Sequence, residues 1–334
     1  MPALPDTPTT MPHHHPQPCA SHVRFPAPRP RISAVVVRLW SATLLTTLAA
    51  CTTLPPVAPV APAAPVVAPK PGVRSGHLPP PAAPTDAATL AVAARLALLG
   101  QPDVLLLGEQ HDAPEHHRLH LAVVQALASS GQLAAVVLEM ADSGQHTRNL
   151  GAQSSEAQVQ QALRWRESAW PWSAYGPAVM AAVAAGVPVL GGNLPRPQNA
   201  RTMHQAALDT RIPPAALARQ RQAVAEGHCN LLPASQITPM TRIQIARDAT
   251  MAKTLGAAIR PGQTVLLLTG SQHADKTVGV PLHLEPRHSL RSVRLDASGL
   301  RPDDAQGFDA VWPTTPLPPR DHCAELGKMP GLGR

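Results

Sequence analysis

Short apolar runs, each followed within two residues by glycine or glutamate, constrain the fold of this chain more than any other feature. The runs are 103–107 (DVLLL), 134–138 (AAVVL), 187–190 (VPVL) and 264–268 (TVLLL), with a fifth candidate at 289–295. Short continuous apolar runs are typical of parallel strands that are covered on both faces. The pattern therefore predicts an α/β fold, with a mostly parallel sheet flanked by helices.

Helical patterns fill the segments between these strands. Helices are expected over 87–99 and 112–128. Residues 191–263, between the third and fourth strand candidates, contain no strand pattern and are too long for one crossover. Three helices are predicted there, at 197–209, 213–226 and 235–259. We expect a small inserted helical subdomain at about 197–260.

The N-terminal region predicts export. Three arginines between positions 29 and 38 precede a short apolar run, 39–50, which ends in Leu-Ala-Ala-Cys. A run of this length, at about 1.5 Å per residue, is too short to cross roughly 30 Å of hydrocarbon as a helix. Small residues directly before Cys51 resemble the lipobox of bacterial lipoproteins. We expect residues 1–50 to be a signal peptide, although the segment before the apolar run is unusually long. We expect Cys51 to be lipidated.

A proline-rich stalk is predicted over 51–85. Residues 52–84 contain eleven prolines among alanine and valine, a composition that favours extended polyproline II and forms no core. The folded domain is expected at 86–325. Thr52 stands where lipoprotein sorting rules place Asp for retention at the inner membrane, so the resemblance favours a lipid-anchored protein of the cell envelope, at the outer membrane.

The net charge and the number of cysteines limit which partners the chain can bind and in which compartment it folds. After cleavage the chain keeps 24 Lys and Arg against 20 Asp and Glu, with no basic run that would indicate a nucleic-acid partner. Besides Cys51, the remaining cysteines are Cys229 and Cys323. They either form a disulfide in an oxidising compartment or remain as two buried thiols.

Polar side chains follow the predicted strands. Glu109 and His111 follow the first strand, Glu139 the second and His273 the fourth, and Gly-x-x-His occurs twice. Ligands of open α/β sheets bind beyond the carboxyl ends of the strands, so we expect these groups to converge. They could hold a divalent metal ion or transfer protons. Alternatively, they satisfy one another and the loop amides.

Two further histidines lie on the first helix after the sheet begins. His116 and His120 are four residues apart and share a helix face, a spacing that can bind a metal ion. Such residues are also common as surface or capping groups. His116 or the neighbouring His117 is near enough to the start of the helix to face the predicted pocket.

Most aromatic residues of the folded part are clustered. Trp165, Trp170, Trp172 and Tyr175 lie within eleven residues, and Tyr175 is the only tyrosine of the chain. The cluster suits a flat apolar ligand, and a tyrosine phenolate can bind ferric haem iron. The same cluster is equally consistent with a local hydrophobic core through which a long loop packs on the sheet.

Taken together, these segments resemble a known family. In order, they are LLLGEQHDAPEHHRLHL, VVLEM, WPWSAYGPAV, VPVLGGNLPR, GHCNLLP, RIQIARDATMA and LLLTGSQHADKTVGVP, from about residue 100 to 285. They resemble the ChaN family of iron-regulated, haem-binding lipoproteins, in the superfamily of the Tiki proteases and erythromycin-esterase-like proteins. The resemblance implies a dimer with haem at the subunit interface and a tyrosine as the axial iron ligand.

The resemblance also implies roles for single residues. It assigns the iron to Tyr175, beside Trp172 in the same segment, and a haem propionate to Lys276. His111 and His273 occupy the Gly-x-x-His positions of the metal-dependent Tiki enzymes. In a haem-binding protein they would contact the propionates or be the remnant of an ancestral metal site. The segments around Cys229 and Cys323 fit the cysteine-bearing segments of the family, which favours the disulfide.

Two functional hypotheses follow. The first is a lipoprotein that binds haem and serves haem or iron acquisition, with an outer-membrane haem receptor as a partner. The second is a metal-dependent hydrolase of the Tiki or esterase type, in which Glu109, His111, Glu139 and His273 hold a divalent ion or activate water. Hydrolysis has no need of Tyr175 and its tryptophans, and haem binding has no evident need of both Gly-x-x-His turns.

Overall fold

The computed structural model describes residues 87–299, 306–318, 320, 321, 323 and 324. The predicted signal peptide, the lipidated Cys51 and the stalk lie outside the described residues. Within the described part, no helix is long and apolar enough to span a bilayer.

One parallel sheet of six strands forms the centre of the fold, as the apolar runs predict. The strands are β1 (Val104–Glu109), β2 (Leu133–Asp142), β3 (Val189–Asn193), β4 (Thr264–Gly270), β5 (Leu290–Asp296) and β6 (Ala310–Pro313). Their order in the sheet is β3-β2-β4-β1-β5-β6, and every pairing is parallel. Only β6 was not expected, because its four residues are too short to stand out as a strand.

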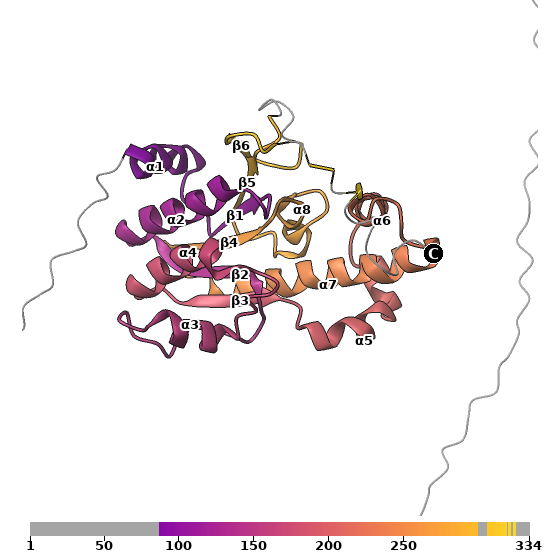
Figure 1. Ribbon diagram of the computed structural model, residues 1–334, viewed down its shortest axis with the longest axis horizontal. Coiled ribbons are helices and arrows are strands. Elements are labelled where there is room, and N and C mark those ends of the chain that lie inside the picture. The colour runs from indigo at the N-terminus through magenta and orange to yellow at the C-terminus, as the bar shows by residue number, and fades with distance from the viewer. Residues whose placement is uncertain (1–86, 300–305, 319, 322, 325–334) are drawn as a thin grey trace, which may run out of the picture. The chain divides into compact units, whose positions relative to one another are not determined.

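Helices cover both faces of the sheet (Figure 1). The helices α1 (Ala87–Leu99), α2 (Pro114–Ser129) and α4 (Trp172–Ala184) share one core with Leu105 and Leu107 of β1. The long helix α7 (Ala234–Ala258) packs on the other face, against Val104 and Leu106. Alternate residues of β1 thus face opposite cores, which is why its run is apolar without interruption.

Two helices between β2 and β3 were not predicted from the sequence. The first, α3 (Glu156–Leu163), begins with a capping box in which Ser155 and Gln158 satisfy each other's backbone amides. The second, α4, contains Pro177 and begins directly after Pro171, and prolines weaken the helical pattern of a sequence. The aromatic segment 165–175 therefore ends within a helix that packs on the sheet.

The segment between β3 and β4 is helical. It contains η1 (Arg196–Gln198), α5 (Asn199–Met203), η2 (Ala206–Thr210), α6 (Pro214–Gly227) and α7. The first half of α7 contributes Ile243 and Ile245 to a small separate core, whereas its second half packs Met251 and Leu255 against the sheet. The helical part is therefore joined to the sheet through one continuous helix.

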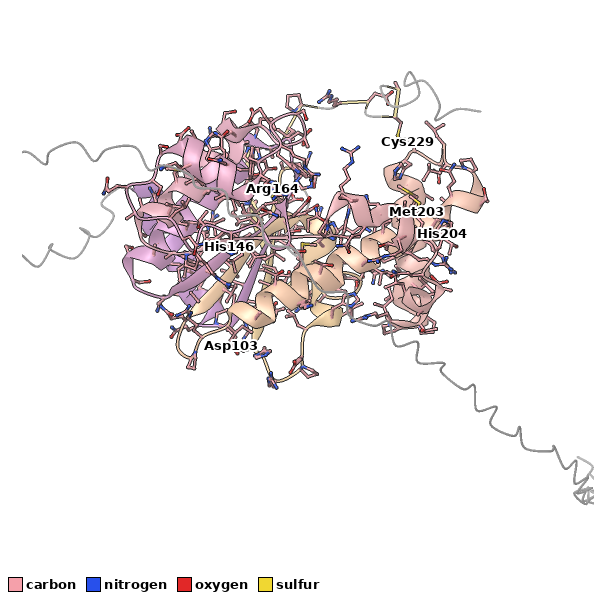
Figure 2. All side chains as sticks on the ribbon, turned by 90° about the horizontal axis from the view of Figure 1, so that it is seen from below. Asp103, His146, Arg164, Met203, His204 and Cys229 are labelled. Carbon is pink, nitrogen blue, oxygen red and sulfur yellow. A yellow bond between two sulfur atoms is a disulfide. The ribbon has the colours of Figure 1, made fainter. Side chains whose placement is uncertain are left out.

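The helical part lies beyond one end of the sheet. Figure 1 places α5 and α6 past the short helix α8 (Ser271–Ala274), which directly follows β4. Figure 2 shows Cys229, Met203 and His204 at this end of the molecule and Asp103, just before β1, at the other. The predicted disulfide is confirmed, because Cys229 is bonded to Cys323 at a Cα–Cα distance of 5.5 Å.

Replacement of Gly108 by alanine tests the packing of α8 on β1. A Cβ at position 108 would lie 2.8 Å from the Cα of Ser271 and 2.9 Å from the Cβ of Ala274, so the helix has to move. We expect Gly108→Ala to lower the free energy of unfolding by about 1–3 kcal/mol in urea denaturation. The matched control is Gly256→Ala in α7, where a Cβ meets nothing within 4 Å. Equal effects of the two substitutions would contradict the packing argument.

Candidate functional site

The pairing of β1 with β4 brings the two Gly-x-x-His turns together. In this register Glu109 lies opposite Gly270, so both turns leave the sheet at the same level. The side chains of Glu109, His111, Glu139 and His273 line one open cleft of about 1270 Å³ at the carboxyl ends of the strands. The structure thus brings together the four residues that the sequence places at separate strand ends.

Gly270 lets two of these side chains approach each other. An added Cβ at this position would lie 3.0 Å from Nε2 of His111 and 3.7 Å from Oε2 of Glu139. The His111 imidazole and the Glu139 carboxylate therefore both lie close to the backbone of Gly270. A larger residue there would displace the His111 ring.

Glu109 is the buried carboxylate beneath the His111 side of the cleft. Its Oε1 accepts hydrogen bonds from Nδ1 of His111 at 2.7 Å and from the hydroxyl of Tyr175 at 2.8 Å. Its Oε2 lies 3.5 Å from Nε2 of His117 and 3.7 Å from Nε2 of His120. Burial raises the pKa of Glu109, but the imidazoles of His120 and His111 outweigh burial and hold it below its usual value. The group is therefore a carboxylate that fixes His111.

A second buried carboxylate holds the other histidine turn. Oε2 of Glu139 accepts hydrogen bonds from Thr269 Oγ1 at 2.7 Å and from the Gly270 amide at 2.8 Å. Its Oε1 lies 3.4 Å from Nε2 of His273, whose Nδ1 bonds Asp248 at 2.6 Å. Burial lowers the pKa of His273, but the Glu139 and Asp248 carboxylates outweigh it and raise the pKa to about 10. His273 is therefore an imidazolium between two acids.

Asp248 and Gln220 support this arrangement, and neither was predicted as a site residue. Asp248 is fully buried on α7, and Nε2 of Gln220 on α6 donates to its Oδ2 at 3.1 Å and to the Val278 carbonyl at 3.0 Å. Both lie within helices, where a single polar residue normally indicates a solvent-facing position. Both residues are far from the strand ends in the sequence, so the sequence does not indicate their contacts with the cleft.

The histidines and carboxylates do not fit a divalent metal ion. Both ring nitrogens of His273 face carboxylates, Nδ1 at Asp248 and Nε2 at Glu139, and one oxygen of Glu139 already accepts hydrogen bonds from Thr269 and Gly270. Across the residues that the structure describes, no group of three or more His, Cys, Asp or Glu side chains is arranged to hold a metal ion. The metal site of the second hypothesis is therefore not supported.

The aromatic cluster borders a second hollow. Trp170 packs edge-on against His111 at 4.9 Å and against Tyr175 at 5.8 Å between ring centroids. A pocket of about 500 Å³ lies beside them, with Pro114 and Pro171 in its wall. This aromatic pocket and the polar cleft share His111 and Asp112. One ligand with an apolar part and a polar part could therefore occupy both.

Tyr175 is a core residue that also lines the aromatic pocket, whereas Trp172, which the resemblance places beside the haem, belongs to the core and lines neither hollow. Only 2% of Tyr175 is exposed, and its hydroxyl points to Glu109. Burial and the Glu109 carboxylate both raise the pKa of this phenol. Nε1 of Trp172 donates to Glu156 at 3.0 Å, and its ring packs edge-on against Trp165. In this arrangement Tyr175 lines the aromatic pocket with its ring but does not present its hydroxyl to a ligand.

His116 and Lys276 lie away from both hollows. His116 is fully buried, with Nδ1 accepting from the Gln110 amide at 2.9 Å and Nε2 lying 3.0 Å from Thr314 Oγ1. Both of its nitrogens are engaged, so it does not form a metal-binding pair with His120. Lys276 donates to Asp309 at 2.8 Å. Neither residue lines the cleft or the aromatic pocket.

The protonated His273 predicts a characteristic pH dependence of stability. Its folded-state pKa is raised from 6.5 to about 10, so its contribution is complete below pH 6.5 and is lost as the pH rises towards 10. We expect His273→Gln to destabilise the protein most at pH 6, with the difference from wild type shrinking by pH 10. Urea denaturation of both proteins from pH 6 to pH 10 measures this difference in the free energy of unfolding. A difference that grows with pH would contradict the assignment.

The comparisons with known proteins agree with the fold. The sequence matches the family described as haem-binding uptake, Tiki superfamily, ChaN, over residues 96–284. A solved structure described as "Cofacial heme binding to ChaN of Campylobacter jejuni" is similar, with a TM-score of 0.52 and 25% identity, covering 65% of this chain and 88% of that one. The type III effector HopBA1 aligns with a TM-score of 0.38 and 16% identity, over 65% of this chain and 90% of its own. No curated protein matches. The chain belongs to the ChaN family of the Tiki superfamily.

Proposed function

We propose that this protein is an exported, lipid-anchored protein that binds haem and takes part in haem or iron acquisition. The main support is the pair of adjoining hollows, one aromatic and one polar, that share His111. Membership of a family described as haem-binding uptake supports the same ligand, as does the haem bound by the similar protein of Campylobacter jejuni.

The chemistry of the two hollows fits haem. The ring of Trp170, with Pro114 and Pro171, offers an apolar wall to a flat macrocycle. The polar cleft contains Arg247 and Arg320, whose guanidinium groups suit the propionate carboxylates. Haem bound there would need a protein side chain as a ligand for its iron.

We assign the axial ligand to His111. Glu109 binds Nδ1 of His111, which fixes the ring and leaves Nε2 as the coordinating atom, as in other metal-binding histidines. The His111 side chain is 42% exposed where the two hollows meet. Tyr175, the ligand that the family resemblance implies, has to lose both its proton and its hydrogen bond to Glu109 before it can bind iron. The buried position of its hydroxyl opposes both changes.

Export and anchoring complete the proposal. The Cys229–Cys323 disulfide is typical of proteins that fold in oxidising compartments, which supports export. Lipidation of Cys51 would then anchor the domain to the outer membrane through its stalk. A haem held at an open cleft leaves one face uncovered, and a second copy of the chain is the proposed cover. An outer-membrane haem receptor is the proposed partner for delivery.

A haemin titration of the full-length, detergent-solubilised protein tests the proposal. We expect a saturable Soret shift for wild type and a loss of affinity of about tenfold or more for His111→Ala, because each 1.4 kcal/mol of lost ligation is tenfold in Kd. Tyr175→Phe should keep the spectrum of the wild type. The control for adventitious histidine binding is His204→Ala, an exposed residue of the helical part (Figure 2).

Each outcome of the titration decides a separate point. Loss of the wild-type spectrum in Tyr175→Phe, with His111→Ala unaffected, would assign the iron ligand to Tyr175. It would also show that the tyrosine hydroxyl becomes accessible when haem binds. An equal effect of His204→Ala would indicate non-specific binding. No saturable shift in the wild-type protein would refute haem binding.

A further inference from the structure

The segment after β6 forms a wall of the polar cleft. We call residues 314–318, 320, 321 and 323 the strap. It starts along β5, where the Thr314 amide donates to the Asp296 carbonyl at 2.8 Å and the Leu317 amide to the Ala297 carbonyl at 3.0 Å. Leu317, Pro318 and Arg320 then line the same cleft as the two histidine turns. These residues lie beyond position 284, where the match to the family ends.

The far end of the strap is bonded covalently to the helical part. Cys323 is joined to Cys229, which lies in the turn between α6 and α7, across 94 residues of sequence. Cys229 and the following Asn230 both adopt positive φ, 55° and 56°, which fixes a tight reversal at the end of α6. The disulfide therefore ties the cleft wall to the end of a helix rather than to a loose loop.

Helix α6, which ends just before the Cys229 turn, is also linked to His273, a lining residue of the cleft. Gln220 of α6 donates to Asp248 at 3.1 Å, and Asp248 bonds His273 at 2.6 Å. Arg219, one residue earlier, lies 3.8 Å from Asp275, which follows α8. Helix α6 and the turn after it are thus linked to the cleft in two ways. Buried polar groups link α6 to His273, and the disulfide links the turn to the strap.

We propose that the Cys229–Cys323 disulfide holds the strap as a wall of the haem site, so that reduction of the disulfide opens the cleft and speeds haem release. The inference rests on the proposed haem binding. A dithiol reductant supplies two electrons and two protons, the S–S bond breaks, two cysteine thiols form, and the reductant leaves as a disulfide. The cut strap keeps its backbone hydrogen bonds to Asp296 and Ala297 and the bond from the Thr315 amide to Glu115, but it loses its covalent link to Cys229.

The physical effect is a gain in chain freedom at the cleft. A crosslink that closes a long loop restricts the chain on both sides of it, and its removal restores many conformations to the strap. Arg320 and Pro318 would then spend less time beside the bound ligand. Because contacts within one site change mainly the dissociation rate, haem release should respond more than haem capture.

The experiment measures haemin dissociation from the full-length protein into excess apomyoglobin. Oxidised wild type is compared with dithiothreitol-reduced wild type and with the double variant Cys229→Ser/Cys323→Ser. We expect release about tenfold faster from the reduced and double-variant proteins, and no effect of dithiothreitol on the double variant. Circular dichroism of all samples checks that the sheet and helices are retained.

Hydrogen exchange of the haem-free protein provides a readout that does not depend on haem. Reduction should increase exchange in the strap and at the end of α6, while β1 and β4 stay protected. Faster exchange of the strap with unchanged haemin release would overturn the proposal, because the strap would then be free of the site. Absence of haemin binding in every sample would refute the proposed function instead, and unchanged exchange would show that the disulfide does not hold the strap.

Discussion

The parallel pairing of β1 with β4 is the constraint on which the rest of the site depends. Because Glu109 lies opposite Gly270, two turns separated by more than 150 residues leave the sheet side by side. Gly108 lets α8 pack directly on β1, and Gly270 lets the His111 ring lie over the neighbouring strand. The repeated Gly-x-x-His pattern is thus a packing requirement first. Its glycines create the space in which its histidines meet the carboxylates.

The fold was largely predictable because burial on both faces leaves a clear pattern. Each of the runs around 104–107, 134–138 and 265–268 is apolar throughout, and each forms a central strand. Strand β6 was missed because four residues give no periodicity, and α4 because Pro171 and Pro177 interrupt its helical signal. Edge strands and proline-containing helices depend on tertiary contacts for their stability, which local sequence does not report.

The site was predictable where it follows from fold class and unpredictable where it depends on side-chain direction. The convergence of Glu109, His111 and His273 follows from their positions after parallel strands. The direction of the Tyr175 hydroxyl does not, because an aromatic residue on a helix can face either the core or a ligand. Asp248 and Gln220 were missed for a related reason. Their contacts with the cleft arise from the path of α7 and α6, which no spacing in the sequence encodes.

The paired charges of His273 and Glu139 suit these two groups to a structural role in the cleft. A general acid or base works best when its pKa lies near the ambient pH. Here the carboxylates of Glu139 and Asp248 raise the pKa of His273 to about 10, and the histidines of the cleft hold the pKa of Glu139 far below its usual value. Each group is thus locked in its charged form by the other, and neither exchanges a proton readily near neutrality. Together with Asp248, these two charges join α8, β2 and α7 around the opening, and His111 lies between the aromatic pocket and the polar cleft.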